Sequence, residues 1–237
     1  MATKNWTRNE LILALNLYYK TPFGRIHTGN PEIIDLAEKL GRTPGSVSFK
    51  LANFVSLDPT LDRKGSSNTS KLDREVWNAF FENMEELSFE SEQAIQQLNN
   101  KDKPGVEREM TSKARVNQQF FRKMILASYE NRCCITGLNL PELLVASHII
   151  PWSAKESLRM DPRNGLALNA LHDKAFDRGL VSFDSSGKML VSSRLKKDAV
   201  KHADYLIQFE QKPIQMPSKF KPSPEALAYH REHIFQP

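Results

Sequence analysis

The sequence contains very little cysteine: its only two thiols, Cys133 and Cys134, are neighbours in the chain. Neighbouring cysteines do not form an ordinary unstrained disulfide, so a disulfide framework is excluded and a reducing compartment is expected. The sequence also lacks an apolar run approaching the ~20 residues that a membrane-spanning helix needs. Residues 1–10 lack the apolar core of a signal peptide. We therefore expect a soluble, cytoplasmic protein with no membrane partner.

Charge is unevenly distributed along the 237 residues, of which 40% are hydrophobic, enough for one large or two small domains. Residues 1–71 carry 10 Lys and Arg against 6 Asp and Glu, and residues 72–98 carry 1 against 7. The remaining residues carry 22 against 15. Two basic blocks separated by an acidic segment are compatible with a polyanionic partner, although charge alone does not identify one.

Helix signals dominate the N-terminal third. Residues 7–20 are rich in helix formers, with Thr7 and Glu10 spaced as a capping box. Residues 31–54 predict two helices, in which Gly41 supplies the turn and Thr43 caps the second helix. The spacing of small and apolar residues is that of a helix-turn-helix. The residues concerned are Ala37, Gly41, Val47 and Leu51.

A helix-turn-helix packing suggests that residues 1–71 form an all-helical module that positions DNA. Lys50 and Arg42 are the candidate phosphate contacts, and we expect Lys50 and Asn53 to be exposed. The alternative is a helical hairpin that only builds a small core. Residues 72–105 are expected to form an acidic helical spacer that ends in a charged linker at 99–105.

Residues 106–237 contain the residues that carry chemistry. His148 ends an apolar, strand-like run, Asn164 precedes Gly165 at the start of a second short strand, and His172 lies on the helix expected at 170–178. Strand, loop, strand and helix form a ββα unit, which can hold one metal ion between a strand end and the helix. We expect an α+β protein in which this unit follows the helical module.

The residue types suit phosphodiester hydrolysis. A histidine, with a pKa near ~6.5, can act as a general base close to neutral pH. A divalent cation can stabilise the charge on the phosphate and on the leaving oxygen. An asparagine side chain both donates and accepts, so Asn164 can hold a loop in place.

The segment resembles the HNH endonuclease family, the ββα-metal nucleases, and in particular its restriction-endonuclease-like branch. The matching stretches are Ser-His-Ile-Ile-Pro-Trp (147–152), Asn-Gly-Leu-Ala-Leu (164–168) and Leu-His-Asp-Lys-Ala-Phe-Asp (171–177). The resemblance implies that His148 is the general base, Asn164 the orienting residue and His172 a metal ligand. It also implies one divalent ion, with Mg²⁺ expected and Mn²⁺ or Ni²⁺ as alternatives.

Two departures from the family pattern concern metals. Many relatives place Asp or His directly before the base, where this chain has Ser147; Asp173, beside His172, is the candidate that compensates. Many relatives also bind zinc through two Cys-x-x-Cys pairs. Here Thr136 stands at the second position of the first pair and residues 169–172 contain no cysteine, so no structural zinc is expected.

The predicted function is a metal-dependent endonuclease acting on double-stranded DNA, in restriction or in defence against foreign DNA. Three basic residues flank the predicted site and are candidate phosphate contacts: Arg163, Lys174 and Arg178. A homodimer would allow both strands to be cut. The alternatives are a DNA-binding or regulatory protein with an inactive HNH domain, which Ser147 keeps open, and a nuclease acting on RNA.

Overall fold

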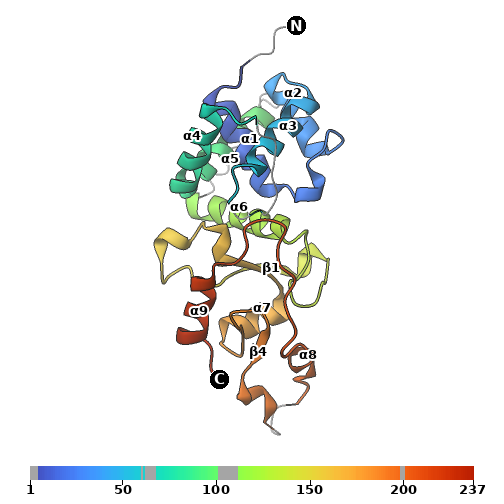
Figure 1. Ribbon diagram of the computed structural model, residues 1–237, viewed down its shortest axis with the longest axis vertical. Helices are drawn as coiled ribbons and strands as arrows, with labels where there is room; N and C mark the ends of the chain where they lie inside the picture. The colour runs from blue at the N-terminus through green and yellow to red at the C-terminus, as the bar shows by residue number, and fades with distance from the viewer. Residues whose placement is uncertain (1–4, 60, 62–67, 101–111, 198–200) are drawn as a thin grey trace. The chain divides into compact units, whose positions relative to one another are not determined.

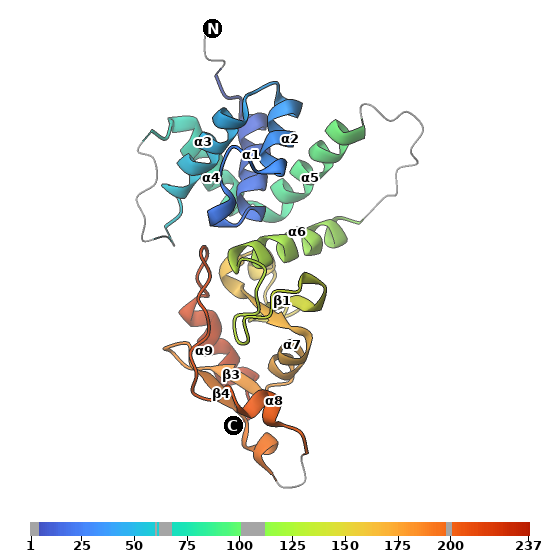
Figure 2. The same ribbon diagram turned by 90° about the vertical axis from the view of Figure 1, so that its right-hand side faces the viewer.

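Helix α1 (Arg8–Lys20) lies at the centre of the first of two compact units, Met1–Met124 and Ile125–Pro237. The computed structural model, shown in Figures 1 and 2, describes residues 5–59, 61, 68–100, 112–197 and 201–237. Every side chain of α1 from Glu10 to Tyr19 is buried. The predicted capping box is confirmed, since the Glu10 amide donates to Thr7 Oγ1 and the Thr7 amide donates to the Glu10 carboxylate.

Four helices pack against α1: α2 (Pro31–Leu40), α3 (Pro44–Val55), α4 (Lys71–Glu82) and α5 (Met84–Asn100). An aromatic cluster fills the space between them, because α1 contributes two adjacent tyrosines to the faces of α3 and α4. Its members are Tyr18, Tyr19, Phe54, Trp77 and Phe80. The core of this unit is therefore aromatic.

The helix pair α2–α3 has the predicted ends. Gly41 follows α2 with φ of 60°, and Thr43 Oγ1 accepts a hydrogen bond from the Ser46 amide at the start of α3. Ala37, Val47 and Leu51 are fully buried. These contacts establish the hairpin of helices and leave its role with DNA a prediction.

The predicted exposure of Lys50 and Asn53 is wrong. Lys50 is 7% exposed, and its ammonium group lies 2.8 Å and 2.9 Å from the two Asp73 carboxylate oxygens. Asn53 is 2% exposed. The physical reason is that Asp73 of α4 packs against this side of α3 and buries a helix face that the sequence pattern predicted to be exposed.

Arg42 is also directed inward. Its guanidinium group lies 2.9 Å from the Glu10 carboxylate, donates to the Asn5 carbonyl and packs 4.0 Å above the Trp6 ring. If Arg42 or Lys50 moved out to bind a phosphate, the buried carboxylate of Glu10 or Asp73 would lose its ion pair, which costs several kcal/mol. The ion pairs therefore argue against the predicted phosphate contacts of Arg42 and Lys50, which stay untested predictions.

The acidic segment packs on α1 and is part of the first unit, whereas we expected a spacer between two domains. Asn16 in α1 donates to Ser91 Oγ at 2.8 Å and to Glu92 at 2.9 Å, and Lys20 pairs with the same Glu92. These polar groups lie between α1 and α5, so one face of the acidic segment is packed against α1 and is not exposed to solvent. Residues 101–105 of the expected linker lie outside the described residues.

Helix α6 (Lys113–Ser128) leads into the second unit, which contains the predicted ββα arrangement. Strands β1 (Leu144–His148) and β2 (Gly165–Asn169) form an antiparallel pair, with His148 opposite Gly165. Helix α7 (Ala170–Asp177) packs on both strands (Figure 2). The α+β class is confirmed. Short 3₁₀ turns are η1 (Phe23–Arg25), η2 (Pro141–Leu143), η3 (Glu156–Leu158), η4 (Pro162–Asn164) and η5 (Ser193–Lys196).

The predicted second hairpin and final helix are also present. Strands β3 (Val181–Phe183) and β4 (Met189–Val191) are antiparallel, α8 (Asp204–Ile207) is a single turn, and α9 (Pro224–His233) packs on β3. His230 of α9 is 1% exposed and stacks on Phe176 with ring centroids 3.6 Å apart. Its Nε2 donates to the Phe176 carbonyl, and its Nδ1 accepts from Ser182 Oγ. His230 therefore has a structural role.

This burial makes His230 a source of acid sensitivity. Burial lowers its pKa from 6.5 to about 4, so between these pH values His230 is neutral in the folded chain and protonated in the unfolded chain. The resulting stability is fully present above pH 6.5 and is lost as the pH falls towards 4, by up to about 3 kcal/mol. Chemical denaturation at a series of pH values should show that His230→Gln is less stable near pH 7 and has a shallower pH dependence. Equal slopes for parent and variant would contradict this account.

Residues 234–236 lie against Gly179, which has φ of +66°. Its carbonyl accepts from the Gln236 amide, and a Cβ added to it would collide with the Ile234 carbonyl oxygen. Gly179→Ala is therefore expected to lower the free energy of unfolding by about 3 kcal/mol, from left-handed backbone strain and the loss of this close approach. Gly24→Ala is the matched control, because its Cβ would meet nothing within 4 Å. Equal thermal shifts for both variants would contradict the prediction.

Candidate active site

His148, the last residue of β1, is held by a backbone carbonyl. Its Nε2 lies 2.9 Å from the carbonyl oxygen of Arg159. A carbonyl oxygen only accepts, so Nε2 carries the proton and Nδ1 carries the lone pair. Burial lowers the pKa of His148 below 6.5 and outweighs the Arg159 carbonyl, which raises it. The imidazole is thus neutral near pH 7, in the protonation state that a general base requires.

Asn164 ties the two ends of the loop between β1 and β2 together. Its Oδ1 accepts from the Ile150 amide at 2.8 Å, and its Nδ2 donates to the carbonyls of Ile150 and Leu158 at 3.1 and 3.2 Å. Its own carbonyl accepts from the Ile149 amide at 2.9 Å. The side chain is 2% exposed, so its hydrogen bonds hold the backbone that follows His148 without competition from water.

The same loop surrounds the imidazole with two further groups. The Trp152 ring lies edge-on to His148 with centroids 5.4 Å apart. Arg159 donates from Nε to the Trp152 carbonyl at 3.0 Å and lies over the indole ring. The sequence does not indicate that the Arg159 carbonyl binds His148, because every residue has a backbone carbonyl.

Ser147 and Asp173 face each other across β1 and α7. The Ser147 hydroxyl is buried and makes no hydrogen bond of normal geometry, yet it lies near enough to influence the Asp173 carboxylate. Burial raises the pKa of Asp173, while Ser147 lowers it and Asp177 raises it further. Two oxygen-bearing side chains from different elements are therefore brought together, one of them with an unused lone pair.

His172 is the neighbour of Asp173 on α7, and its ring has different surroundings. Its Nδ1 lies 3.0 Å from Asn169 Oδ1, which also accepts from the His172 amide as the cap of α7. The ring lies edge-on to Phe209, and Nε2 is buried without a partner. Burial lowers the pKa of His172 to about 4. Asn169 was missed as a site residue, although an Asn directly before a helix is a recognised cap signal.

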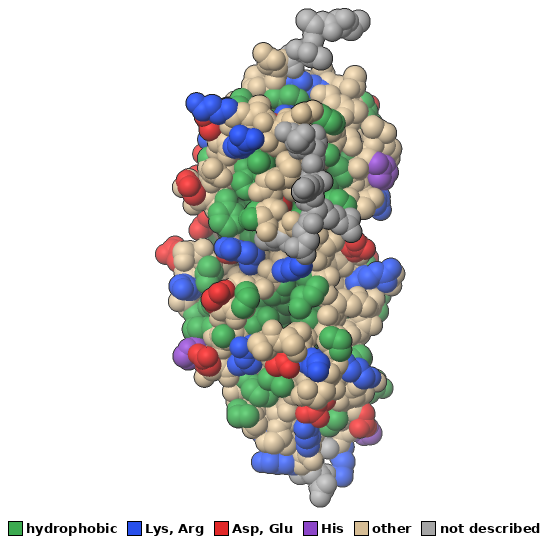
Figure 3. Space-filling view, viewed as in Figure 1, with side chains coloured by type: hydrophobic (Ala, Val, Ile, Leu, Met, Phe, Trp, Pro, Cys, Tyr) green, Lys and Arg blue, Asp and Glu red, His purple; other side chains and the backbone are tan. Residues whose placement is uncertain are grey.

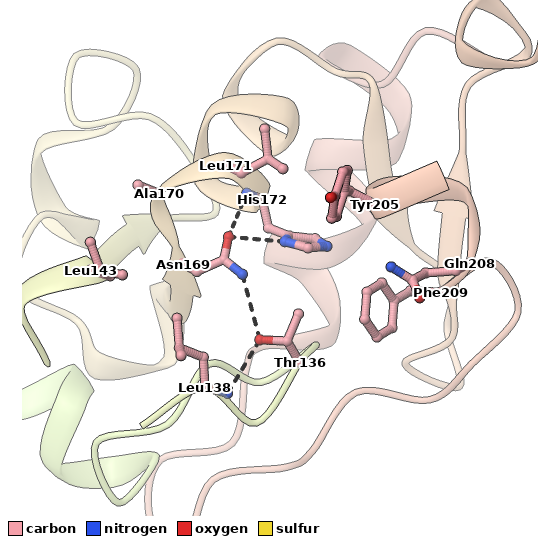
Figure 4. Close-up of a pocket in the computed structure, with 10 residues that line it drawn as sticks. All are labelled: Thr136, Leu138, Leu143, Asn169, Ala170, Leu171, His172, Tyr205, Gln208 and Phe209. Carbon is pink, nitrogen blue, oxygen red and sulfur yellow. Dashed lines mark hydrogen bonds between the residues drawn. The ribbon is translucent and has the colours of Figure 1, made fainter. Parts of the chain in front are cut away.

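His172, Asn169 and Thr136 line one pocket, shown in Figure 4. Asn169 Nδ2 donates to Thr136 Oγ1 at 3.5 Å, which joins the start of α7 to the turn after Cys134. Cys133 and Cys134 are buried, and burial raises the pKa of the Cys134 thiol. Among the described residues, no three His, Cys, Asp or Glu side chains are grouped so that they could hold a metal ion.

The pocket around His172 is lined by neither Ser147, His148 nor Asp173. Consecutive residues of an α-helix point about 100° apart. Asp173 therefore turns towards Ser147 while His172 turns towards Asn169 and Phe209. The structure thus separates the surroundings of the two side chains, and the metal-ligand roles of His172, Ser147 and Asp173 stay predictions.

The predicted phosphate contacts near the site differ in availability. Arg163 makes a bidentate ion pair with Asp161, at 3.0 and 2.7 Å, so its guanidinium group already binds a carboxylate. Lys174 is exposed on α7, and Arg178, which is also exposed, is the residue that caps the C-terminal end of α7. On the face shown in Figure 3, the coloured Lys and Arg side chains are interspersed with Asp and Glu and form no continuous basic field.

Comparison with known proteins agrees with this arrangement. Residues 133–184 match the family model described as HNH endonuclease. A comparison with curated proteins found no significant match. None of the described helices combines the length and apolar character that crossing a bilayer requires. The matched segment runs from Cys133 through β1, β2 and α7 to the residue after β3, and this segment is similar to the HNH endonuclease family.

Proposed function

We propose that this chain is a metal-dependent endonuclease that hydrolyses phosphodiester bonds in double-stranded DNA. The observation that carries the proposal is the hydrogen bond from His148 Nε2 to the Arg159 carbonyl, which puts the imidazole proton on Nε2 and the basic lone pair on Nδ1. The similarity of the matched segment to the HNH endonuclease family supports a nuclease, which is a hydrolase of phosphodiester bonds.

In the proposed reaction, His148 Nδ1 removes a proton from a water molecule as the water oxygen attacks phosphorus. The bond to the leaving 3′ oxygen breaks in line with the attack. Asn164 acts as a positioning residue, because its three hydrogen bonds hold the loop that supplies the Arg159 carbonyl. A neutral, fixed imidazole lowers the barrier both by orientation and by accepting the proton.

The residues at Ser147 and Asp173 fit Mg²⁺. This ion prefers oxygen ligands, retains several waters and is commonly held by one or two carboxylates together with substrate phosphate. Asp173 would supply the carboxylate, and the Ser147 hydroxyl, which is buried and makes no hydrogen bond of normal geometry, would supply a second oxygen. A bound divalent ion would neutralise charge on the scissile phosphate and the leaving oxygen. Mn²⁺ and Ni²⁺ remain alternatives.

Two regions are proposed to contact the DNA backbone. Lys174 lies on the helix that carries Asp173 and Arg178 caps its C-terminal end, so both are proposed to bind phosphates beside the one that is cut. The α2–α3 pair in residues 1–71 is proposed to position DNA through its outer surface, without Arg42 and Lys50. The nuclease domain is proposed to span residues 106–237.

The biological setting proposed for this activity is restriction or defence against foreign DNA, in the cytoplasm. A homodimer would place two active sites on the two strands. The competing proposal is a DNA-binding or regulatory protein whose HNH domain is inactive, and it is favoured by the neutral Ser147 at a position where many relatives carry a charged ligand.

Incubation of the protein with supercoiled plasmid tests the proposal. Cleavage is expected with Mg²⁺, Mn²⁺ or Ni²⁺ and is expected to stop when EDTA is added. Parallel reactions with a structured RNA separate a DNA nuclease from an RNA nuclease. Retained DNA binding with no cleavage under any of the three metals would overturn the enzyme and leave the regulatory alternative.

A further inference from the structure

The loop between β1 and β2 includes an exposed segment, residues 153–157, in which every residue is exposed. Asn164 fastens the backbone directly after this segment, since its Nδ2 donates to the Leu158 carbonyl at 3.2 Å. The next residue is Arg159, whose own carbonyl oxygen lies 2.9 Å from His148 Nε2. The orientation of the proposed base therefore depends on backbone at the end of an exposed segment.

The Arg159 side chain crosses back over this segment to the residue that precedes it. Its Nε donates to the Trp152 carbonyl at 3.0 Å, and its guanidinium carbon lies 5.3 Å from the centroid of the Trp152 ring. A charged donor makes a stronger hydrogen bond than a neutral donor, and the face of an indole ring attracts a cation. Arg159 thus joins the two ends of the exposed segment by two contacts.

Trp152 also contacts the imidazole, which closes a set of three residues. The Trp152 ring lies edge-on to the His148 ring, with centroids 5.4 Å apart. His148 is bound in turn by the Arg159 carbonyl. Each of the three residues contacts the other two, so the imidazole cannot rotate without disturbing both neighbours.

An arginine suits this position better than a lysine. The guanidinium N–H groups lie in one plane, so Nε can donate to a carbonyl while the plane covers the indole ring, whereas a lysine ammonium group has no such plane. The outer contact of Arg159, from Nη1 to Glu156 at 3.1 Å, involves a carboxylate side chain that is 78% exposed. Exposed ion pairs contribute little, so the contacts with Trp152 are the ones that hold the loop.

We propose that the Arg159 side chain is a positioning residue for the hydrolysis, which clamps the loop through Trp152 and thereby keeps the Arg159 carbonyl on His148 Nε2. This inference rests on the proposed nuclease function and adds a second residue to Asn164 in orienting the base. The guanidinium group acts through His148 and does not bind the phosphate that is cut.

The proton on His148 Nε2 reports this clamp without any cleavage. Because the carbonyl holds it, the N–H is expected to exchange slowly with water and to give a resolved signal in the histidine ring ¹⁵N–¹H spectrum of the parent near pH 7. Arg159→Ala should lose this signal by rapid exchange. An absent signal in the parent, or one that persists unchanged in Arg159→Ala, would overturn the clamp.

Two further variants make the spectrum specific. Lys155→Ala is the matched control, because it removes one positive charge from an exposed residue of the same loop and should keep the signal. Arg159→Lys keeps the charge and most of the side chain but lacks the guanidinium plane, so it should lose the signal as Arg159→Ala does. A parental signal in Arg159→Lys would contradict the assigned contacts with Trp152.

The cleavage rate supplies an independent measurement. Arg159→Ala should cut DNA about fivefold more slowly at saturating Mg²⁺, the factor that corresponds to the net free energy of one hydrogen bond. DNA affinity should stay within about twofold of the parent, and Lys155→Ala should cut at the parent rate. Equal losses of rate in the two variants would show an effect of charge on DNA and would refute the positioning role.

Combining Arg159→Ala with His148→Ala decides whether Arg159 acts through the base. Residues that act as a unit have non-additive effects. The double variant should therefore cleave within about twofold of His148→Ala alone. A further fivefold loss would mean that Arg159 acts on the substrate independently of His148, contrary to the proposal.

The spectrum and the rate separate this inference from the function on which it rests. A chain that cuts DNA, but whose Arg159→Ala variant keeps both the Nε2 signal and the rate, loses only the clamp. A chain that never cuts DNA, but whose Nε2 signal depends on Arg159, loses the proposed hydrolysis and keeps the clamp on His148.

Discussion

His148→Ala is expected to reduce the rate of DNA cleavage by about 1000-fold, the largest effect of any single change in this chain. General-base catalysis contributes roughly 10²–10⁴ in rate, and the hydrogen bond to the Arg159 carbonyl puts the basic lone pair of His148 on Nδ1. The quantity to measure is the initial rate of loss of supercoiled plasmid at saturating Mg²⁺. DNA affinity should stay within about twofold of the parent, because the proposed role of the imidazole is to accept a proton from water and not to bind DNA.

Two controls make this result specific. His27→Ala removes an exposed histidine of the first unit and should cleave at the parent rate. Added imidazole should restore part of the activity of His148→Ala, since it can enter the space left by the side chain and accept the proton. A variant that cleaves as fast as the parent would remove His148 from the mechanism.

Asp173→Asn has the second largest expected effect. The amide keeps the size of the carboxylate but removes its charge, so the Mg²⁺ concentration for half-maximal cleavage should rise at least about 10-fold. His148→Ala should leave that concentration unchanged wherever residual activity is measurable. Cleavage rate as a function of Mg²⁺ concentration checks both statements. Asp177→Asn is the matched control, because Asp177 is exposed on the same helix.

Ser147→Asp tests the same proposed metal site by adding a carboxylate to it, whereas Asp173→Asn removes one. The second carboxylate enters a site that is 3% exposed and faces Asp173, so without metal the two charges repel and the melting temperature should fall. Mg²⁺ should restore the melting temperature and should be needed at a lower concentration for cleavage. If Mg²⁺ stabilises neither this variant nor the parent, the metal does not bind between residues 147 and 173.

The local elements were predictable because their signals lie within a few residues of each other. The Thr7–Glu10 capping box, the Gly41 turn and the short second hairpin depend on backbone preferences and on neighbouring side chains. The order of His148, Asn164 and His172 likewise indicated strand, loop, strand and helix. The matched HNH segment contains that arrangement.

Predictions of exposure were less successful in the first unit. Lys50 and Arg42 look like surface cations in the sequence, and in the structure they pair with Asp73 and Glu10. Asp73 lies in the acidic segment that seemed to be a spacer. A sequence pattern does not indicate which distant helix will cover a given face, since that depends on how α1 gathers the other helices around it.

The sequence by itself therefore determined the type of chemistry: a histidine at a strand end, an asparagine that closes a loop and a helix that follows. Only the tertiary structure decided which atoms meet. It placed the Arg159 carbonyl on His148 Nε2, turned Asp173 towards Ser147 and turned His172 into the neighbouring pocket. The physical reason is directional. Adjacent helical side chains diverge by about 100°, and a hydrogen bond forms only when the fold brings donor and acceptor within about 3 Å in the correct orientation.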